Sequence, residues 1–346
     1  MRTTLFCKNP YAFGILKPLN DELANRGMPV IWYIPGEIIN LFPYKESCNY
    51  TSEIQRIADF NNDVLIVPGN EVPHYLRGLK VQVFHGLAGE KKGHFRIRHY
   101  FDLYLTQGPY FTERFKQLAN KYKDFDVIET GWPKLDSLFN QKNAYISEKQ
   151  SILKESGTDK IVLYAPTFSP SLTSATALKN EIIKIADKKT VLLIKFHDLM
   201  NKKVIDEYRE IEKQNSHIRI IHDNNITKYL ILADLLISDT SSVVYEFLLL
   251  DKPVITFRSH SKHIHWQNIV NPVELTDSVQ NTFSKDRFTN QRKWIINNYH
   301  PYSDGCSSKR IVETLISYLE SHPVPEERKI SWFRKRKMVT MFGKIN

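Results

Sequence analysis

Four hydroxyl groups and one carboxylate lie within five consecutive residues, Ser238, Asp239, Thr240, Ser241 and Ser242. The short apolar run at 235–237 before them predicts a buried strand, and the apolar face at helical spacing over 243–248 predicts a helix. At such a junction, unpaired backbone N–H groups and side-chain hydroxyls attract an anion. One hydroxyl alone would be explained as an N-cap, but four in five residues favour a phosphate site.

Two histidines follow other predicted strands. His85 and Gly86 end the strand expected over 80–84, and His197 follows the strand expected over 190–194, two residues after Lys195. An imidazole near its ordinary pKa can take a proton from an attacking hydroxyl, and a glycine lets the backbone approach a ligand. In an extended segment Lys195 and His197 point to the same side, where a cationic pair suits a diphosphate. For each histidine, an exposed loop position without function is the alternative.

Apolar runs alternate with helical patterns along the chain. The predicted strands cover 3–7, 30–34, 64–67, 80–84, 103–105, 125–129, 161–164, 190–194, 218–221, 235–237 and 254–257. The predicted helices cover 14–26, 112–121, 147–155, 177–187, 203–213, 226–232, 243–248, 292–299 and 307–321. This alternation predicts parallel sheets with helices on both faces, and ligands bind at the carboxyl ends of such strands.

The length of 346 residues predicts two domains, which the polar stretch 140–159 would join. We therefore expect an α/β protein with two facing, doubly wound, Rossmann-like domains and a cleft between them, the glycosyltransferase-B (GT-B) arrangement. The expected domains are 1–140 and 141–325, followed by a tail over 326–346. The three scattered cysteines fit a reducing cytoplasm, and neither a signal peptide nor a spanning segment is expected.

The tail over 326–346 holds half of the net charge of +10. Its basic residues alternate with apolar ones, among them Trp332 and Phe333, and this composition suits the surface of an anionic membrane. A disordered basic tail, or a last helix packed on the body, is the alternative. No nucleic-acid motif accompanies the charge, so no nucleic-acid partner is expected.

Five segments at predicted strand ends carry motifs that occur together in one known family. They are His85-Gly86 followed by Lys91-Lys92, GWPKLD at 131–136, YAPTF at 164–168, KFHD at 195–198, and SDTSS at 238–242 followed by Glu246-Phe247 and DKP at 251–253. Together they resemble the CDP-glycerol glycerophosphotransferase family, the primases and polymerases of teichoic acids and related phosphate-linked capsules. The chain departs from the family pattern at Asp198, where proline is usual, and at Lys134-Leu135, where Arg-Asn is usual.

The resemblance implies transfer of a polyol phosphate, most simply glycerol phosphate, from a CDP-activated donor to a hydroxyl of a lipid-linked saccharide or polymer, with release of CMP. His85 would act as general base, while His197 and Lys195 would neutralise phosphate charge. The remaining substrate-binding residues would be Gly86, Thr167, Glu246 toward the ribose, and the whole hydroxyl cluster. Within that cluster Asp239 would orient His85 or a lysine, or cap the loop.

The resemblance assigns domain 1–140 to the acceptor and domain 141–325 to the CDP-polyol. It places the protein as a peripheral enzyme on the inner face of the cell membrane. No aspartate cluster indicates a metal, so neither a metal nor a cofactor is expected. Two other functions stay open, a nucleotide-sugar glycosyltransferase or epimerase of similar fold, and a non-catalytic membrane-associated assembly protein. The polyol, and the choice between primase and polymerase, also stay open.

Overall fold

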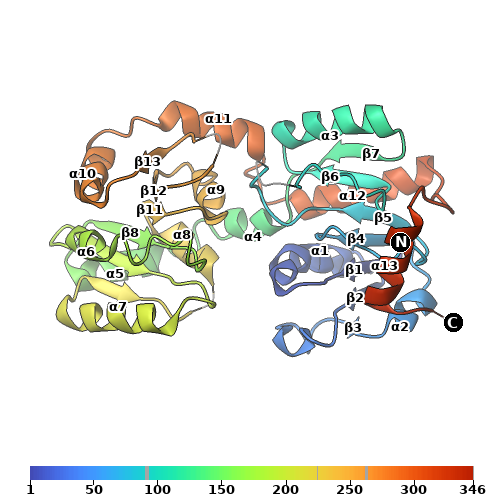
Figure 1. Ribbon diagram of the computed structural model, residues 1–346, viewed down its shortest axis with the longest axis horizontal. Helices are drawn as coiled ribbons and strands as arrows, with labels where there is room; N and C mark the ends of the chain where they lie inside the picture. Colours follow the sequence, from blue (N-terminus) through green and yellow to red (C-terminus); the bar gives the residue numbers. More distant parts are fainter. Residues whose placement is uncertain (90–92, 224, 262–263, 346) are drawn as a thin grey trace. The chain divides into compact units, whose positions relative to one another are not determined.

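The computed structural model describes residues 1–89, 93–223, 225–261 and 264–345, and within them the chain forms two compact units (Figure 1). Unit 1 contains residues 1–139 and 298–346, and unit 2 contains residues 140–297. The segment 298–325, which we expected in the second domain, therefore belongs to unit 1. This assignment follows from tertiary packing, because helix α12 (Ser307–Ser321) packs against helix α1 (Phe13–Asn25) of unit 1.

Unit 1 is built on a seven-stranded sheet in which every neighbouring pair of strands is parallel. The strand order is β3-β2-β1-β4-β5-β6-β7. The strands are β1 Thr3–Phe6, β2 Val30–Tyr33, β3 Tyr50–Thr51, β4 Val64–Val67, β5 Leu79–Gln82, β6 Leu103–Thr106 and β7 Asp126–Glu129. The order reverses direction between β1 and β4, which makes the sheet doubly wound.

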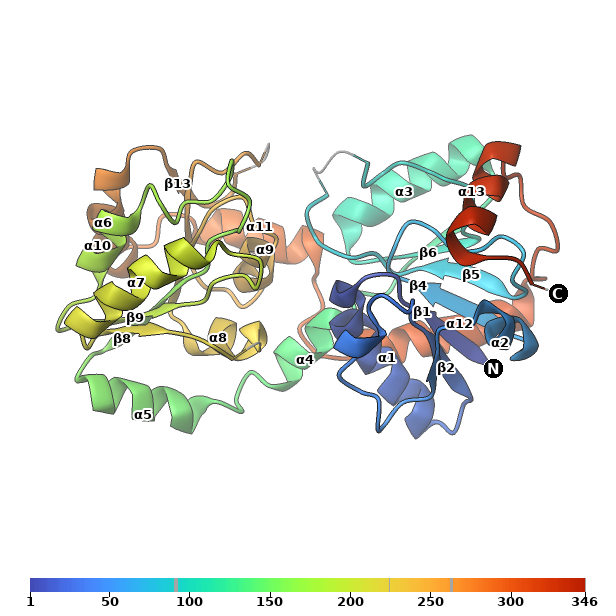
Figure 2. The ribbon, with the colours of Figure 1, turned by 60° about the horizontal axis from the view of Figure 1, so that its bottom comes forward.

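Helices cover both faces of this sheet (Figure 2). Helices α1 and α12 lie on one face. On the other face α2 (Ile54–Asp59), α3 (Pro109–Tyr122) and α13 (Trp332–Phe342) share one apolar core. Helix α4 (Lys134–Asn140) follows β7.

Unit 2 repeats the plan with six parallel strands in the order β10-β9-β8-β11-β12-β13. They are β8 Lys160–Tyr164, β9 Thr190–Ile194, β10 Ile218–Ile220, β11 Leu235–Ser238, β12 Val254–Phe257 and β13 Gln267–Ile269. The helices are α5 Ile146–Ser156, α6 Lys179–Ile182, α7 Lys202–Gln214, α8 Ile226–Leu232, α9 Val243–Leu248, α10 Leu275–Ser284 and α11 Thr289–Tyr299, of which the last two residues belong to unit 1.

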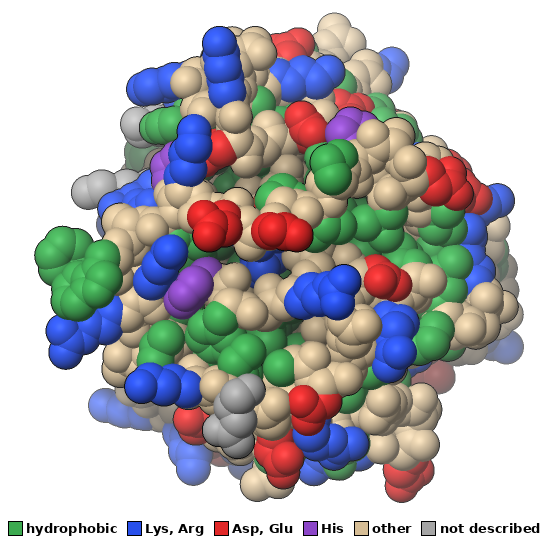
Figure 3. All heavy atoms as spheres, turned by 90° about the vertical axis from the view of Figure 1, so that its right-hand side faces the viewer, with side chains coloured by type: hydrophobic (Ala, Val, Ile, Leu, Met, Phe, Trp, Pro, Cys, Tyr) green, Lys and Arg blue, Asp and Glu red, His purple; other side chains and the backbone are tan. Residues whose placement is uncertain are grey.

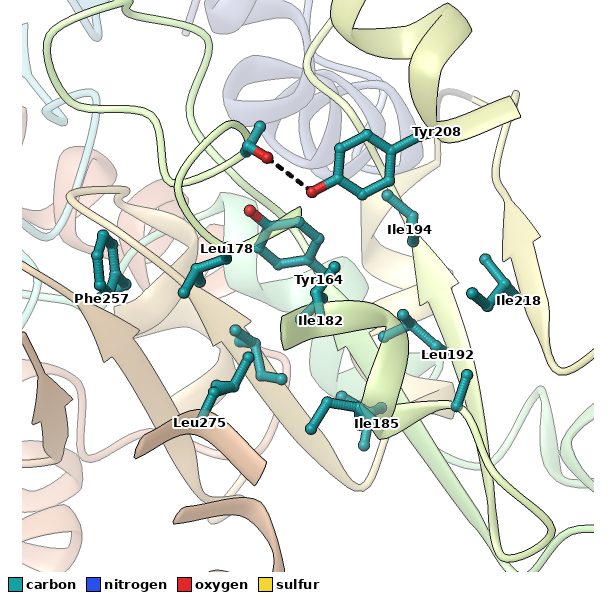
Figure 4. Packing of buried hydrophobic residues seen from close by; sticks show 14 of the residues in the cluster. Tyr164, Leu178, Ile182, Ile185, Leu192, Ile194, Tyr208, Ile218, Phe257 and Leu275 are labelled. Atoms are coloured by element: carbon teal, nitrogen blue, oxygen red, sulfur yellow. Dashed lines mark hydrogen bonds between the residues drawn. The ribbon is translucent and has the colours of Figure 1, made fainter. Parts of the chain in front are cut away.

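On one face of its sheet, unit 2 has an apolar core shared with helices α6, α7 and α10. Figure 4 shows this packing, in which Tyr208 of α7 lies over the strand residues Tyr164 and Ile194. The buried Tyr208 hydroxyl donates a hydrogen bond of 2.8 Å to the Ala175 carbonyl and is thereby satisfied. The helix expected over 177–187 is shorter, because a 3-10 turn (Ile183–Ile185) ends it.

The basic tail forms helix α13, which packs on unit 1. Met338 and Phe342 are buried in the core of that unit, whereas Trp332 and Phe333 are 62% and 78% exposed. Among the described residues, no helix is long and apolar enough to span a bilayer. The tail is therefore a docked helix with two exposed aromatic rings near its amino end.

Candidate functional site

In unit 1, His85 lies exposed after the carboxyl end of β5. Its Nδ1 atom lies 3.2 Å from the carbonyl oxygen of Pro68, which follows β4. Because a carbonyl only accepts hydrogen bonds, the neutral ring carries its proton on Nδ1 and keeps a lone pair on Nε2. This hydrogen-bond state is the one that a general base requires.

The backbone before His85 is held in an unusual conformation. Phe84 has a φ of 61°, in the left-handed region that bulky residues rarely adopt. Its carbonyl accepts a 3.3 Å hydrogen bond from Nε1 of buried Trp132, and its ring stacks on His94 at a centroid distance of 5.4 Å. Burial, and to a smaller degree the electrostatic effect of the nearby imidazole of His85, lower the pKa of His94 to about 3. Neutral aromatic packing thus fixes the direction in which the chain leaves β5.

Gly86 is held by a 3.0 Å hydrogen bond from the side-chain amide of Gln107 to its carbonyl oxygen. An added Cβ at Gly86 would meet no atom within 4 Å, so packing does not require glycine there. The lysines at 91 and 92 that belong to the same motif lie outside the described residues.

Other polar residues lie at the same edge of this sheet and were not predicted from the sequence. The ring of Tyr11 lies 5.5 Å from that of His85, and Lys8 forms a 2.5 Å ion pair with Glu71. Lys337 of α13 also pairs with Glu71, which ties the last helix to the loop after β4. The turn-forming pair Asn9-Pro10 after the first strand was the one local signal for this loop.

In unit 2, two members of the hydroxyl cluster are used inside the protein. Ser238 is buried and donates a 2.6 Å hydrogen bond to the Ala165 carbonyl. The buried carboxylate of Asp239 accepts hydrogen bonds from the backbone of Thr167 (3.0 Å), and from both the backbone and hydroxyl of Ser174 (2.9 Å each). Burial raises the pKa of Asp239, and these hydrogen bonds oppose that effect.

The expectation that Ser238 and Asp239 contact a substrate is therefore corrected. Both side chains position the loop after β8, and for Asp239 this is the loop-capping alternative named above. The sequence pattern could not distinguish these two residues from Thr240, Ser241 and Ser242. Ser238 and Asp239 are buried because they lie at the end of the buried strand β11, and the hydroxyl pattern does not show where that strand ends.

The other three members of the cluster, Thr240, Ser241 and Ser242, are partly exposed. Thr240 accepts a 3.2 Å hydrogen bond from the backbone of His260, and Ser241 accepts one of 3.4 Å from Val243. The helix that follows, α9, has only six residues, so its dipole is short and the loop's own donors matter more. Glu246 is buried on this helix.

His197 is exposed after β9, and its Nδ1 atom accepts a 3.1 Å hydrogen bond from the backbone of Leu199. The neutral ring therefore carries its proton on Nε2, the opposite arrangement to that of His85. Burial lowers the pKa of His197, as does the charge of Lys195, while Asp198 raises it. The ring of Phe168 lies 4.4 Å away.

Lys195 is less exposed than His197 beside it. Its Nζ atom donates a 3.0 Å hydrogen bond to the Phe196 carbonyl and lies 3.9 Å from the Asp198 carboxylate. Thr167, after β8, completes the polar residues at the carboxyl ends of the central strands of unit 2. Each unit thus gathers its predicted site residues at one edge of its sheet.

The family model described as CDP-Glycerol:Poly(glycerophosphate) glycerophosphotransferase matches residues 78–265, more than half of the chain. The chain belongs to this family. The match contains both histidines, the hydroxyl cluster and the strands that position them.

Curated relatives of the chain are teichoic acid enzymes. The chain is 25% identical over 235 residues to the teichoic acid glycerol-phosphate primase of Bacillus subtilis (strain 168), covering 60% of the chain and 58% of the relative. It is 26% identical over 277 residues to the teichoic acid ribitol-phosphate polymerase TarL of Staphylococcus aureus (strain NCTC 8325 / PS 47), covering 68% of the chain and 47% of TarL. The chain thus spans about half to three fifths of the length of these curated relatives.

Solved structures confirm the GT-B fold class. The wall teichoic acid polymerase TagF gives a TM-score of 0.65 at 16% identity, covering 92% of this chain and 90% of TagF. The MnaA–UDP co-structure from S. aureus gives 0.68 at 16% identity, covering 96% and 100%. At this identity the likeness establishes the fold alone.

The family motif at 131–136 has a structural role in this chain. Gly131 has a φ of 87°, and an added Cβ would lie 2.5 Å from the Ser307 hydroxyl oxygen. The buried carboxylate of Asp136 accepts hydrogen bonds from the backbone N–H groups of Ser307 (2.8 Å) and Ser308 (2.7 Å). The motif therefore holds the start of α12, where the chain returns to unit 1.

Proposed function

We propose that this chain transfers a polyol phosphate, most simply glycerol phosphate, from a CDP-activated donor to a hydroxyl of a lipid-linked saccharide or polymer. Family membership supports this reaction class. The CDP donor is further supported by TagF, for which structures of a histidine-to-asparagine variant with CDPG exist. The residues with roles in this reaction are those at the carboxyl ends of the strands in each unit.

The reaction is an in-line displacement at phosphorus. The acceptor oxygen forms a bond to the phosphorus that carries the polyol, the bridging P–O bond of the diphosphate breaks, and CMP leaves with that electron pair. The proton of the acceptor hydroxyl passes to Nε2 of His85. General base catalysis of this kind contributes about 10²–10⁴-fold in rate.

One observation carries the proposal, namely the opposite hydrogen-bond states of the two histidines. His85 uses Nδ1 toward a backbone acceptor, so its Nε2 accepts a proton, whereas His197 uses Nδ1 toward a backbone donor, so its Nε2 donates. A proton acceptor and a phosphate-directed donor are the two functions that the reaction requires.

The donor substrate is assigned to unit 2. Thr167, Thr240, Ser241 and Ser242 supply hydroxyl donors for the diphosphate, and Lys195 supplies positive charge close to His197. Glu246 is assigned to the ribose, because its carboxylate can accept hydrogen bonds from the ribose hydroxyls. The acceptor substrate is assigned to unit 1, with Gly86 giving the backbone close access to it.

We further place the enzyme on the inner face of the cell membrane as a peripheral protein. A lipid-linked acceptor is confined to that surface. The exposed pair Trp332 and Phe333, followed by four consecutive basic residues at 334–337, matches the composition of segments that bind anionic bilayers.

A substrate panel tests the proposal. The protein is incubated with CDP-glycerol, CDP-ribitol or a UDP-sugar, together with an acceptor lipid, and the products are weighed by mass spectrometry. We expect CMP release and an acceptor heavier by one or more polyol phosphates. Turnover of the UDP-sugar alone would support the glycosyltransferase or epimerase alternative, and no turnover of any donor would support a non-catalytic assembly protein.

A further inference from the structure

Unit 1 has a cavity at the amino ends of its strands, opposite to the edge that carries His85. A cavity of about 530 Å³ lies between residues 74–78, which lead into the amino end of β5, and the segment 324–330 with Lys335 of α13. His85 follows the carboxyl end of β5, so this cavity is separate from the proposed active site. Figure 3 looks onto this side of unit 1 and shows a hollow bordered by acidic, basic and histidine side chains.

Charges of both signs line the cavity. Arg77 and Lys335 are positive, and Glu326 and Glu327 are negative. Arg328 also lines it, but an ion pair of 2.6 Å with buried Asp102 neutralises its charge. Apart from the paired Arg328, the lining therefore carries two positive and two negative side chains. This arrangement suits a zwitterion better than a simple anion.

His74 adds a hydrogen-bonding group. Its Nδ1 atom is buried and has no hydrogen-bond partner among the described residues. Burial lowers the pKa of His74, and the charges of Lys335 and Lys80 lower it further, so the ring is neutral near pH 7. This atom is closed off from solvent, so His74 presents the remaining, accessible part of its ring to the cavity.

The wall of the cavity is fixed before any ligand arrives. Arg328 donates to both carboxylate oxygens of Asp102 (2.7 and 2.6 Å) and to the Gly78 carbonyl (3.0 Å). The buried Lys80 donates its Nζ to the Leu76 carbonyl (2.7 Å) and its backbone N–H to Asp102 (2.8 Å). This part of the wall is therefore ordered without a ligand, whereas the charged side chains of Arg77, Lys335, Glu326 and Glu327 are exposed and would be ordered by one.

The exposed aromatic pair adjoins this cavity along the chain. Trp332 and Phe333 lie between two residues that line it, Ile330 and Lys335. Figure 3 shows hydrophobic side chains protruding at the edge of the same face, next to basic ones. Aromatic rings at this position would enter the headgroup region of a bilayer and bring the cavity to the depth of the lipid phosphates.

We propose that the cavity binds the headgroup of an aminophospholipid, with the phosphate at Arg77, Lys335 and His74 and the ammonium at Glu326 and Glu327. A primary ammonium donates up to three hydrogen bonds, which two carboxylates can accept. This inference rests on the membrane association proposed above and adds to it a headgroup preference that net charge alone would not produce.

Vesicle sedimentation tests the preference. The full chain is mixed with phosphatidylcholine vesicles, alone or with phosphatidylethanolamine or phosphatidylglycerol added. We expect phosphatidylethanolamine to strengthen binding by about tenfold, the value of one charge-assisted hydrogen bond. Arg77→Ala and Glu327→Gln should each abolish that gain, whereas Lys329→Ala, an exposed control on the same segment but outside the cavity lining, should keep it.

The arms separate the two proposals. Loss of all vesicle binding in Trp332→Ala/Phe333→Ala would support the proposed membrane association, and the headgroup preference of the cavity is then tested with the soluble headgroup. Should wild-type protein bind no vesicle, calorimetry with soluble glycerophosphoethanolamine still tests the cavity, and Arg77→Ala should weaken that binding. Equal binding of this headgroup by wild type and Arg77→Ala, or a gain with phosphatidylethanolamine that survives in both cavity variants, would overturn the inference. Thermal unfolding of each variant controls for folding.

Discussion

At the scale of single residues, the structure distinguishes side chains that the sequence presents as alike. His85 and His197 both end strands, but their Nδ1 atoms face a carbonyl and an N–H respectively, and so their Nε2 atoms have opposite functions. Likewise, Ser238 and Asp239 are buried while Thr240, Ser241 and Ser242 are partly exposed. The chemistry of each histidine is thus set by one backbone neighbour, and that of the hydroxyl cluster by burial.

His197 should contribute to donor binding more than to proton transfer. Replacing it with alanine removes a hydrogen-bond donor to a charged phosphate, worth roughly 1.5–3 kcal/mol, so the Kd for CDP-glycerol should rise by about tenfold to a hundredfold. Calorimetry on His197→Ala and on the control His322→Ala, an exposed histidine at the end of α12, measures this. An unchanged Kd in His197→Ala would remove His197 from the donor site.

His300 should make the stability of unit 1 depend on pH. Its Nε2 accepts a hydrogen bond from the Trp132 backbone (3.0 Å), and burial lowers its pKa from 6.5 to about 4. The unfolded chain binds a proton there below pH 6.5 and the folded chain does not, so the free energy of unfolding should rise with pH between about 4 and 6.5. The contribution is of the order of 3 kcal/mol.

Urea titrations across this range measure the effect of His300. His300→Gln, which cannot be protonated, should flatten the rise relative to wild type. An identical pH slope in the two proteins would show that other groups, such as His94, cause it.

At the scale of elements, the strand ends were the most predictable part of the fold. The strands 64–67, 190–194 and 254–257 and the helices 226–232 and 307–321 have the predicted bounds, because short apolar runs end at clear polar signals. The two-residue strand β3 and the polar strand β13 were missed, since tertiary pairing rather than local pattern defines them. Helix α10 was also missed, although its apolar residues Leu275, Val279 and Phe283 recur at helical spacing.

Only the residues that belong to the sequence motifs of the candidate site could be predicted, and their contacts could not. Those motifs identified His85, His197 and the hydroxyl cluster, since each follows a strand. They could not show that Asp239 caps the loop after β8, that Tyr11 lies beside His85, or that Asp136 holds the start of α12. Each of these contacts joins residues more than 60 positions apart, for which a single sequence carries no signal.

Asp239 should act on the stability of one loop. Asp239→Asn places an amide donor among backbone donors from Thr167 and Ser174, and leaving such buried groups unpaired costs about 1–3 kcal/mol. The free energy of unfolding, measured by urea titration, should fall by this amount, whereas the exposed control Asp198→Asn should change it little. Wild-type stability in Asp239→Asn would contradict the capping role.

At the scale of the whole chain, the C-terminal segment is part of unit 1 rather than an appendage. Ile330, Met338 and Phe342 are buried in its core, and Arg328 pairs with Asp102 across 226 positions of sequence. Deleting the tail would therefore expose core surface and destabilise unit 1. Membrane binding must be tested by substitutions on the exposed side of α13.

The double variant Trp332→Ala/Phe333→Ala should bind anionic vesicles at least tenfold more weakly while folding normally. If each ring buries about 100 Å² of apolar surface in the bilayer, it contributes roughly 2.5 kcal/mol. Leu41→Ala, which removes an equally exposed apolar side chain of unit 1, is the matched control for vesicle sedimentation. Unchanged sedimentation of the double variant would contradict the proposed orientation of α13 on the membrane.

The central claim is that a neutral His85 accepts the proton of the attacking hydroxyl. The most direct measurement is CMP release from saturating CDP-glycerol with acceptor lipid by wild type and His85→Ala, with donor affinity determined on the same samples. We predict a rate lower by about 10²–10⁴-fold in His85→Ala at a nearly unchanged Kd for the donor. Release of CMP by His85→Ala at the wild-type rate would contradict the claim.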